Sequence, residues 1–193
     1  MAPTVSQSKL VDFALLFQPN HKDPPMAFQA LLQSLPFEQR TLSQTDYGPL
    51  RYFPAPVAIE TKTSSGDLEE AKVQLGVWVA AWFRRVRLLL RGNTETIPVP
   101  MIVIEAGKWA VYYACDQENA IVRILSSVSY FPHTTYIRAH PLQSIYGPDD
   151  IGDTLTMEGI YKLLASIRAI GKWLGQEFGE WFLNNVAQEY PER

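Results

Sequence analysis

The order of the sequence patterns predicts a mixed α/β domain, in which a central mixed β-sheet is flanked by helices. Apolar runs with the alternation typical of strands come first, then a capped helical segment, further strands and a long helical segment. The chain has 193 residues and 47% of them are hydrophobic, which is enough for one domain with a buried core. We therefore expect a single domain over residues 1–193, with residues 1–8 as a flexible extension.

The first third of the chain predicts two extended segments separated by a short helix. Residues 9–17 alternate as a strand does, and residues 26–35 carry apolar side chains at helical spacing up to a proline. Residues 37–49 have no clear periodicity. Residues 50–62 are expected to be extended, and the two prolines in this segment indicate an edge strand or a bulged start.

The central helix is expected over residues 67–91. Asp67 is a favourable N-cap, and Glu70 three residues later can complete a capping box. An apolar stripe recurs at helical spacing along this segment, and Gly92 with Asn93 ends it. The helix is therefore expected to lie with one face on the sheet.

The second half predicts an antiparallel meander followed by a long final helix. Residues 99–105, 108–115 and 120–127 read as strands joined by polar turns, and a further strand is expected around residues 135–139. Residues 155–188 carry large apolar side chains at helical spacing. The last segment therefore predicts a long C-terminal helix.

Charge and composition limit the class of partner. The net charge of −3 and the pI of about 5.6 argue against a nonspecific nucleic-acid coat, which requires local positive charge. One basic stretch stands out within the central helix, and it contains Arg84, Arg85, Arg87 and Arg91. Two interpretations stay open: a weak nucleic-acid-binding patch, or the solvated outer face of a helix whose dipole the arginines complement.

Cysteine use and hydropathy bear on the compartment. The single Cys115 excludes an internal disulfide framework and lies in an apolar run, which favours burial over reactivity. No uninterrupted apolar stretch is long enough to cross a membrane, and no secretory signal is visible. We expect an intracellular protein, nuclear or cytoplasmic, with no membrane partner.

The final helix carries three glycines at four-residue spacing, Gly171, Gly175 and Gly179. Glycines spaced in this way allow another backbone to approach closely. Either an internal element or a second copy of the chain can use such a stripe, so a homodimer is one of the expected arrangements.

The candidate chemistry lies at the end of the second extended segment. Glu60 and Lys62 are two residues apart on a strand, so their side chains project from the same face. Asp12 is a lone acid within the apolar first strand, and a buried acid there requires a partner or a cation. Gln74 lies in the second turn of the helix that follows. Paired carboxylates beside a lysine can hold a divalent cation and an attacking water molecule.

The chain resembles the PD-(D/E)XK nuclease superfamily, and most closely the nuclease-like domain proteins of filamentous fungi. The resemblance covers nearly the whole chain and rests on motifs in a shared order: Lys9-Leu10-Val11-Asp12-Phe13, Tyr47-Gly48-Pro49-Leu50-Arg51, Ile59-Glu60-Thr61-Lys62, Gln74-Leu75-Gly76-Val77-Trp78, Gly107-Lys108-Trp109 and Trp181-Phe182. It implies a restriction-endonuclease-like core and a metal-dependent nuclease that hydrolyses phosphodiester bonds of DNA or RNA.

The same resemblance implies roles for individual residues. Asp12, Glu60 and the main-chain carbonyl of Thr61 would ligate Mg²⁺ or Mn²⁺, ions that prefer oxygen ligands. Lys62 would orient or deprotonate the attacking water and stabilise charge at the phosphorus. Gln74 would position water or a phosphate. Nucleic acid is the implied partner.

The chain also departs from the family pattern. Eight residues precede Lys9, which is too few for the helix and strand that normally open the core, so we expect the N-terminal core helix to be absent. Either the sequence is a fragment of a longer protein, or it is a shortened member of the family with an incomplete site. Val11 rather than proline precedes Asp12. An alternative therefore stands beside the nuclease: an inactive or repurposed nuclease-fold domain that serves as a binding module or holds a small molecule.

Overall fold

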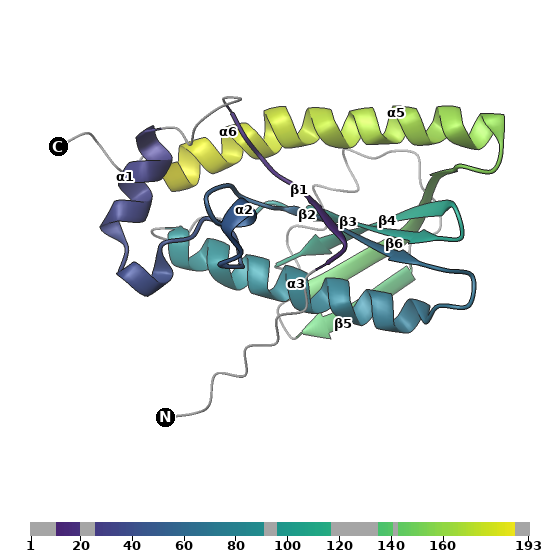
Figure 1. Cartoon of the computed structure of the whole chain (residues 1–193), viewed down its shortest axis with the longest axis horizontal. Coiled ribbons are helices and arrows are strands. Elements are labelled where there is room, and N and C mark those ends of the chain that lie inside the picture. The colour runs from purple at the N-terminus through teal and green to yellow at the C-terminus, as the bar shows by residue number, and fades with distance from the viewer. Residues whose placement is uncertain (1–10, 20–25, 91–95, 117–134, 141–142, 188–193) are drawn as a thin grey trace.

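The computed structural model describes residues 11–19, 26–90, 96–116, 135–140 and 143–187. Within these residues the chain forms a six-stranded mixed sheet with the strand order β1-β2-β3-β4-β6-β5. Helix α3 lies along one side of the sheet, and the long helix that begins with α5 lies along the other (Figure 1). This arrangement confirms the predicted mixed α/β architecture.

Strand β2 (Val57–Lys62) lies inside the sheet. It pairs antiparallel with β1 (Phe13–Leu15) and parallel with β3 (Val99–Glu105). Helix α3 (Leu68–Leu89) connects the two parallel strands. Parallel neighbours require such a crossover, and the crossover helix covers the face of the strands that it connects. The start of α3 therefore lies close to the carboxyl end of β2.

The N-terminal third differs from the prediction in three places. The first strand is predicted over residues 9–17. Among the described residues of this range, only 13–15 form a strand. Residues 50 and 51 are not extended but belong to the short helix α2 (Gly48–Arg51), because Pro49 in its first turn favours a helix start. The two prolines precede β2, which is an interior strand rather than an edge strand.

The remaining elements of this third agree with the sequence pattern. Helix α1 (Met26–Ser34) lies within the predicted range, and a short 3-10 helix, η1 (Phe37–Gln39), follows it. The carboxylate of Asp67 accepts hydrogen bonds from the main-chain nitrogens of Glu69 and Glu70, which confirms Asp67 as the N-cap of α3. Helix α3 ends at Leu89, two residues before the predicted end.

The meander after α3 is confirmed for its first two strands. Strand β4 (Lys108–Cys115) pairs antiparallel with β3 through a two-residue turn, Ala106-Gly107, in which both residues have positive φ. Strands β5 (Thr135–His140) and β6 (Gln143–Asp153) complete the sheet. The strand predicted over residues 120–127 lies outside the described residues, as do Arg91 and the predicted N-terminal extension.

The final helix runs from Met157 to Ala187 with two π-helical stretches. Its successive parts are α5 (Met157–Trp173), η3 (Leu174–Phe178), α6 (Gly179–Phe182) and η4 (Leu183–Ala187). Of the described helices, none is long and apolar enough to span a membrane.

An aromatic cluster joins the final helix to the core. The ring of Phe178 is fully buried and contacts the rings of Phe17, Trp82, Trp173, Trp181 and Phe182. A Cβ atom at Gly179 would lie 2.6 Å from the ring of Phe17, so this glycine is required for internal packing. A Cβ at Gly171 or Gly175 would meet open space. The three glycines therefore do not act together as one stripe.

Candidate functional site

The carboxyl end of β2 places Glu60 and Lys62 side by side, as their spacing predicts. The Nζ of Lys62 lies 3.2 Å from Oε1 of Glu60. Glu60 is 4% exposed, and the side chain of Lys62 is 16% exposed. The pair therefore lies at the boundary between core and solvent, where a small ligand can reach the lysine.

Asp12 reaches the same place from the end of β1. Phe13 pairs with Ile59 in the antiparallel ladder, so the next position along the register sets Asp12 opposite Glu60. The main-chain nitrogen of Asp12 lies 3.4 Å from Oε2 of Glu60. The residue itself is exposed. Asp12 and Glu60 are thus cross-strand neighbours, joined by the contact between the main-chain nitrogen of Asp12 and the carboxylate of Glu60.

Thr61 fixes the carboxylate of Asp12. Oδ2 of Asp12 accepts a hydrogen bond from the main-chain nitrogen of Thr61 at 2.8 Å and another from its hydroxyl at 2.5 Å. The bond from the Thr61 hydroxyl is the main cause that lowers the pKa of Asp12 below its ordinary value, with help from the main-chain bond and the charge of Lys62 and against partial desolvation. Asp12 is therefore a carboxylate at neutral pH.

The main-chain carbonyl of Thr61 lies toward the same edge. Within a strand, the N–H and C=O of one residue point to the same side, and the next residue points to the other side. The nitrogen of Thr61 meets Asp12, whereas the carbonyl of Lys62 accepts from the nitrogen of Ala106 on the β3 side at 3.2 Å. The carbonyl oxygen of Thr61 is consequently directed to the β1 side of β2.

Helix α3 completes the site with Gln74 and Glu70. The Nζ of Lys62 donates to Oε1 of Gln74 at 3.3 Å and lies 3.8 Å from Oε2 of Glu70. The Nε2 of Gln74 donates to Oε1 of Glu70 at 3.0 Å. The structure therefore adds Glu70 to the predicted residues; its four-residue spacing from Gln74 was the available signal, but its sequence position was interpreted as part of a capping box.

The surroundings of Lys62 keep it charged. Burial by itself would lower the pKa of Lys62, but the hydrogen bond to Glu60 and the charges of Glu60, Glu70 and Asp12 outweigh it and raise the pKa above its ordinary value. Lys62 is thus an ammonium ion at neutral pH, held between a strand and a helix.

The donor set of this site fits a hard divalent cation. Asp12 and Glu60 supply carboxylate oxygens and Thr61 a carbonyl oxygen, which are the ligand types that Mg²⁺ and Mn²⁺ accept. Such a site needs only one or two carboxylates, because water and substrate oxygens supply the remaining positions. Among the described residues, no cluster of three or more His, Cys, Asp or Glu side chains has the arrangement of a metal site.

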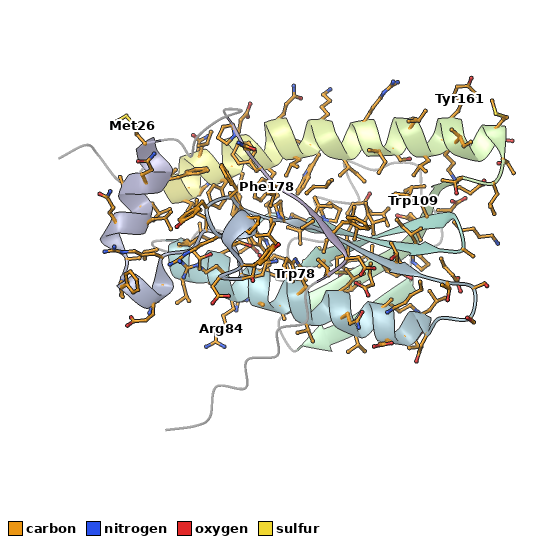
Figure 2. All side chains as sticks on the ribbon, in the orientation of Figure 1. Met26, Trp78, Arg84, Trp109, Tyr161 and Phe178 are labelled. Atoms are coloured by element: carbon orange, nitrogen blue, oxygen red, sulfur yellow. The ribbon has the colours of Figure 1, made fainter. Side chains whose placement is uncertain are left out.

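The predicted basic stretch divides into residues with different surroundings. Arg85 is 7% exposed, and its guanidinium donates to the main-chain carbonyls of Gln39 and Thr41. Arg87 forms an ion pair with the buried Asp116. Arg84 is exposed and projects away from the body of the molecule (Figure 2). The described part of the stretch therefore offers less free positive charge than its composition indicates.

Comparison with known proteins identifies a family for the chain. No curated protein and no solved structure matches the chain. The model of one family, described as the PD-(D/E)XK nuclease superfamily, matches residues 1–179, a range that includes the whole site and all six described strands. The mixed sheet, the flanking helices and the long C-terminal helix are consistent with a restriction-endonuclease-like fold. The chain belongs to the PD-(D/E)XK nuclease superfamily.

Proposed function

We propose that this protein is a divalent-metal-dependent nuclease that hydrolyses phosphodiester bonds of DNA or RNA. The observation that carries the proposal is the meeting of Asp12, Glu60 and Thr61 at one edge of β2, with Lys62 3.2 Å from Glu60. Membership in a nuclease superfamily supports the reaction class.

Asp12, Glu60 and the carbonyl of Thr61 would hold Mg²⁺ or Mn²⁺. A bound ion of this kind acidifies a coordinated water molecule and neutralises charge on phosphate oxygens. The contribution of the protein is to fix its oxygen donors in advance. Thr61 does this for Asp12 through two hydrogen bonds, so the carboxylate loses little side-chain freedom when it binds.

Lys62 is suited to charge stabilisation and to the orientation of water. Its Nζ lies 3.2 Å from Oε1 of Glu60, beside the proposed metal ligands, which favours hydrogen-bond donation to the attacking water or to a phosphate oxygen. Gln74 accepts from Nζ of Lys62 and donates to Glu70, so it holds the direction of the ammonium group. Glu70 is a positioning residue in this scheme.

Two finer parts of the proposal rest on the sequence alone. The order of the motifs favours a relationship to the fungal nuclease-like proteins, and the single cysteine favours a reducing compartment, the nucleus or the cytoplasm.

The test combines metal binding with cleavage on the same samples. Titration calorimetry with Mn²⁺ and cleavage of single- and double-stranded DNA and RNA are measured for the wild type, Asp12→Asn, Glu60→Gln and Lys62→Met. Asp46→Asn is the matched control, because Asp46 is exposed and outside the site. We expect the two carboxylate variants to lose both metal binding and cleavage, and Lys62→Met to keep metal binding while cleavage falls by about 10²-fold or more.

The outcomes separate the nuclease from the alternative reading. Cleavage by the wild type and by Asp46→Asn, lost in the three site variants, supports the proposal. A folded wild-type chain that neither binds Mn²⁺ nor cuts any of the four substrates would overturn it and favour an inactive nuclease-fold module.

A further inference from the structure

The outer side of α5 carries large apolar side chains that face away from the sheet. Met157 is 69% exposed, Tyr161 68% and Leu164 47%. They are four and three residues apart, so they lie on one side of the helix, whereas Leu163 and Ile170 are buried on the opposite side. Figure 2 shows Tyr161 projecting outward from the end of α5. An exposed apolar stripe that faces away from the core indicates an interaction surface.

The same side of α5 changes character along its length. Its N-terminal half carries the bulky apolar residues together with the exposed Glu158. Its C-terminal half continues with the small Ala165 and the exposed basic residues Arg168 and Lys172. The outer face thus carries apolar side chains and an acid in its N-terminal half and basic side chains in its C-terminal half.

We propose that this face of α5 docks onto the same face of a second copy of the chain, with the two helices antiparallel. A two-fold axis beside Leu164 makes the surface self-complementary. Positions at nearly equal distance on either side of the axis then meet. Tyr161, three residues before Leu164, faces Arg168 of the other copy, four residues after it, and Glu158 lies near Lys172 of that copy. Leu164 packs on its own symmetry mate.

The charges select the antiparallel arrangement. In a parallel pairing, Arg168 and Lys172 would meet their own copies and repel each other. The antiparallel pairing replaces this repulsion with a guanidinium–aromatic contact and an ion pair, both of which favour association.

The size of the surface sets the expected affinity. Helix α5 has 17 residues and is therefore about 25 Å long. A single pair of helices of this length buries less than the roughly 800 Å² per partner of a standard interface. We expect a weak, reversible dimer with a dissociation constant in the micromolar range, on the order of 10 μM.

The experiment is sedimentation velocity of the full chain at concentrations that bracket the micromolar range, without nucleic acid or added metal. The wild type should shift from monomer to dimer as its concentration rises. Leu164→Glu should weaken association by at least about tenfold, since it places two carboxylates at the axis. Leu88→Glu, at a 60% exposed position of α3, is the matched control and should leave association unchanged.

A charge swap tests the orientation. Glu158→Lys and Lys172→Glu should each weaken the dimer, and the double variant should restore it, because the opposite charges meet again. Circular dichroism on the same samples verifies that each variant is folded. A chain that stays monomeric at every concentration, an equal effect of Leu88→Glu, or a double variant no better than the singles would overturn the proposal. None of these readouts depends on nuclease activity.

Discussion

The adjacent residues Arg84 and Arg85 allow a test of the contacts that hold residues 39–41 on α3. Arg85 is buried and donates from Nε to the carbonyl of Thr41 at 2.8 Å, and it also bonds the carbonyl of Gln39. Burial lowers the pKa of Arg85 below its ordinary value, but the group stays protonated because its starting value is so high. Arg84 is exposed on the same helix. The two substitutions therefore differ mainly in burial.

The expected cost of Arg85→Ala follows from what it leaves behind. The partly buried carbonyl of Thr41 loses its donor, which costs about 2 kcal/mol, whereas the carbonyl of the exposed Gln39 is rehydrated at little cost. Lost packing of the buried side-chain stem adds about 1 kcal/mol. We expect Arg85→Ala to lower the free energy of unfolding by about 3 kcal/mol and Arg84→Ala to change it by about 0.5 kcal/mol or less.

The assay is urea unfolding at 25 °C, monitored by tryptophan fluorescence and circular dichroism. Coincident transitions with unchanged slopes would allow the two midpoints to be compared as free energies. If the free energies of unfolding of Arg85→Ala and Arg84→Ala differ by less than about 1 kcal/mol, the guanidinium–carbonyl bonds do not hold residues 39–41 on α3, and the reasoning is refuted.

Three further predictions follow from single groups. Thr61→Val removes the hydroxyl donor, so the pKa of Asp12 should rise toward its ordinary value of 3.8 in a carboxyl NMR titration. In the wild type, ionised Asp12 stabilises the fold above that value, and this stabilisation is lost as pH falls through the lower folded pKa; in the variant the contribution should shrink at all pH values. An unchanged pKa would contradict this. Burial raises the pKa of the Cys115 thiol to about 12, so a thiol reagent at pH 8 should label the protein only after denaturation, and rapid native labelling would contradict the burial. Gly152→Ala should lower the free energy of unfolding by about 3 kcal/mol or more, because φ is +120° and a Cβ would lie 2.4 Å from a carbonyl oxygen of α5; Gly76→Ala in open space of α3 should lose none, and equal effects would contradict the steric argument.

The sequence was most informative where local pattern and tertiary position agree. The boundaries of β3 and β4 match the predicted ranges, because alternating apolar residues flank a turn that only a few residue types adopt. The strand position of Glu60 and Lys62 decides that their side chains are neighbours, and the structure confirms that contact. These features depend on residues close together in the chain.

The sequence was less informative where contacts between distant residues determine whether a side chain is buried or belongs to the site. Arg85 reads as a surface residue in a basic stretch, and only the docking of residues 39–41 on α3 buries it. Glu70 reads as a capping residue, and only the approach of Lys62 from β2 makes it part of the site. Residues 50 and 51 form a helical turn because a proline can begin a helix as readily as it can interrupt a strand.

The shortness of β1 links the proposed chemistry to the fold. Three residue pairs hold this edge strand in register, and a slip of one residue would turn every side chain to the other face. The hydrogen bonds from Thr61 to Asp12 add a further contact between β1 and β2 at the end of the ladder. A metal ion bound there would be ligated by the carboxylate of Asp12. The same carboxylate would therefore contribute both to metal binding and to the register of β1. In consequence, a variant that shifts the register of β1 on β2 should also weaken the affinity for the metal ion, even when the substitution lies far from the site.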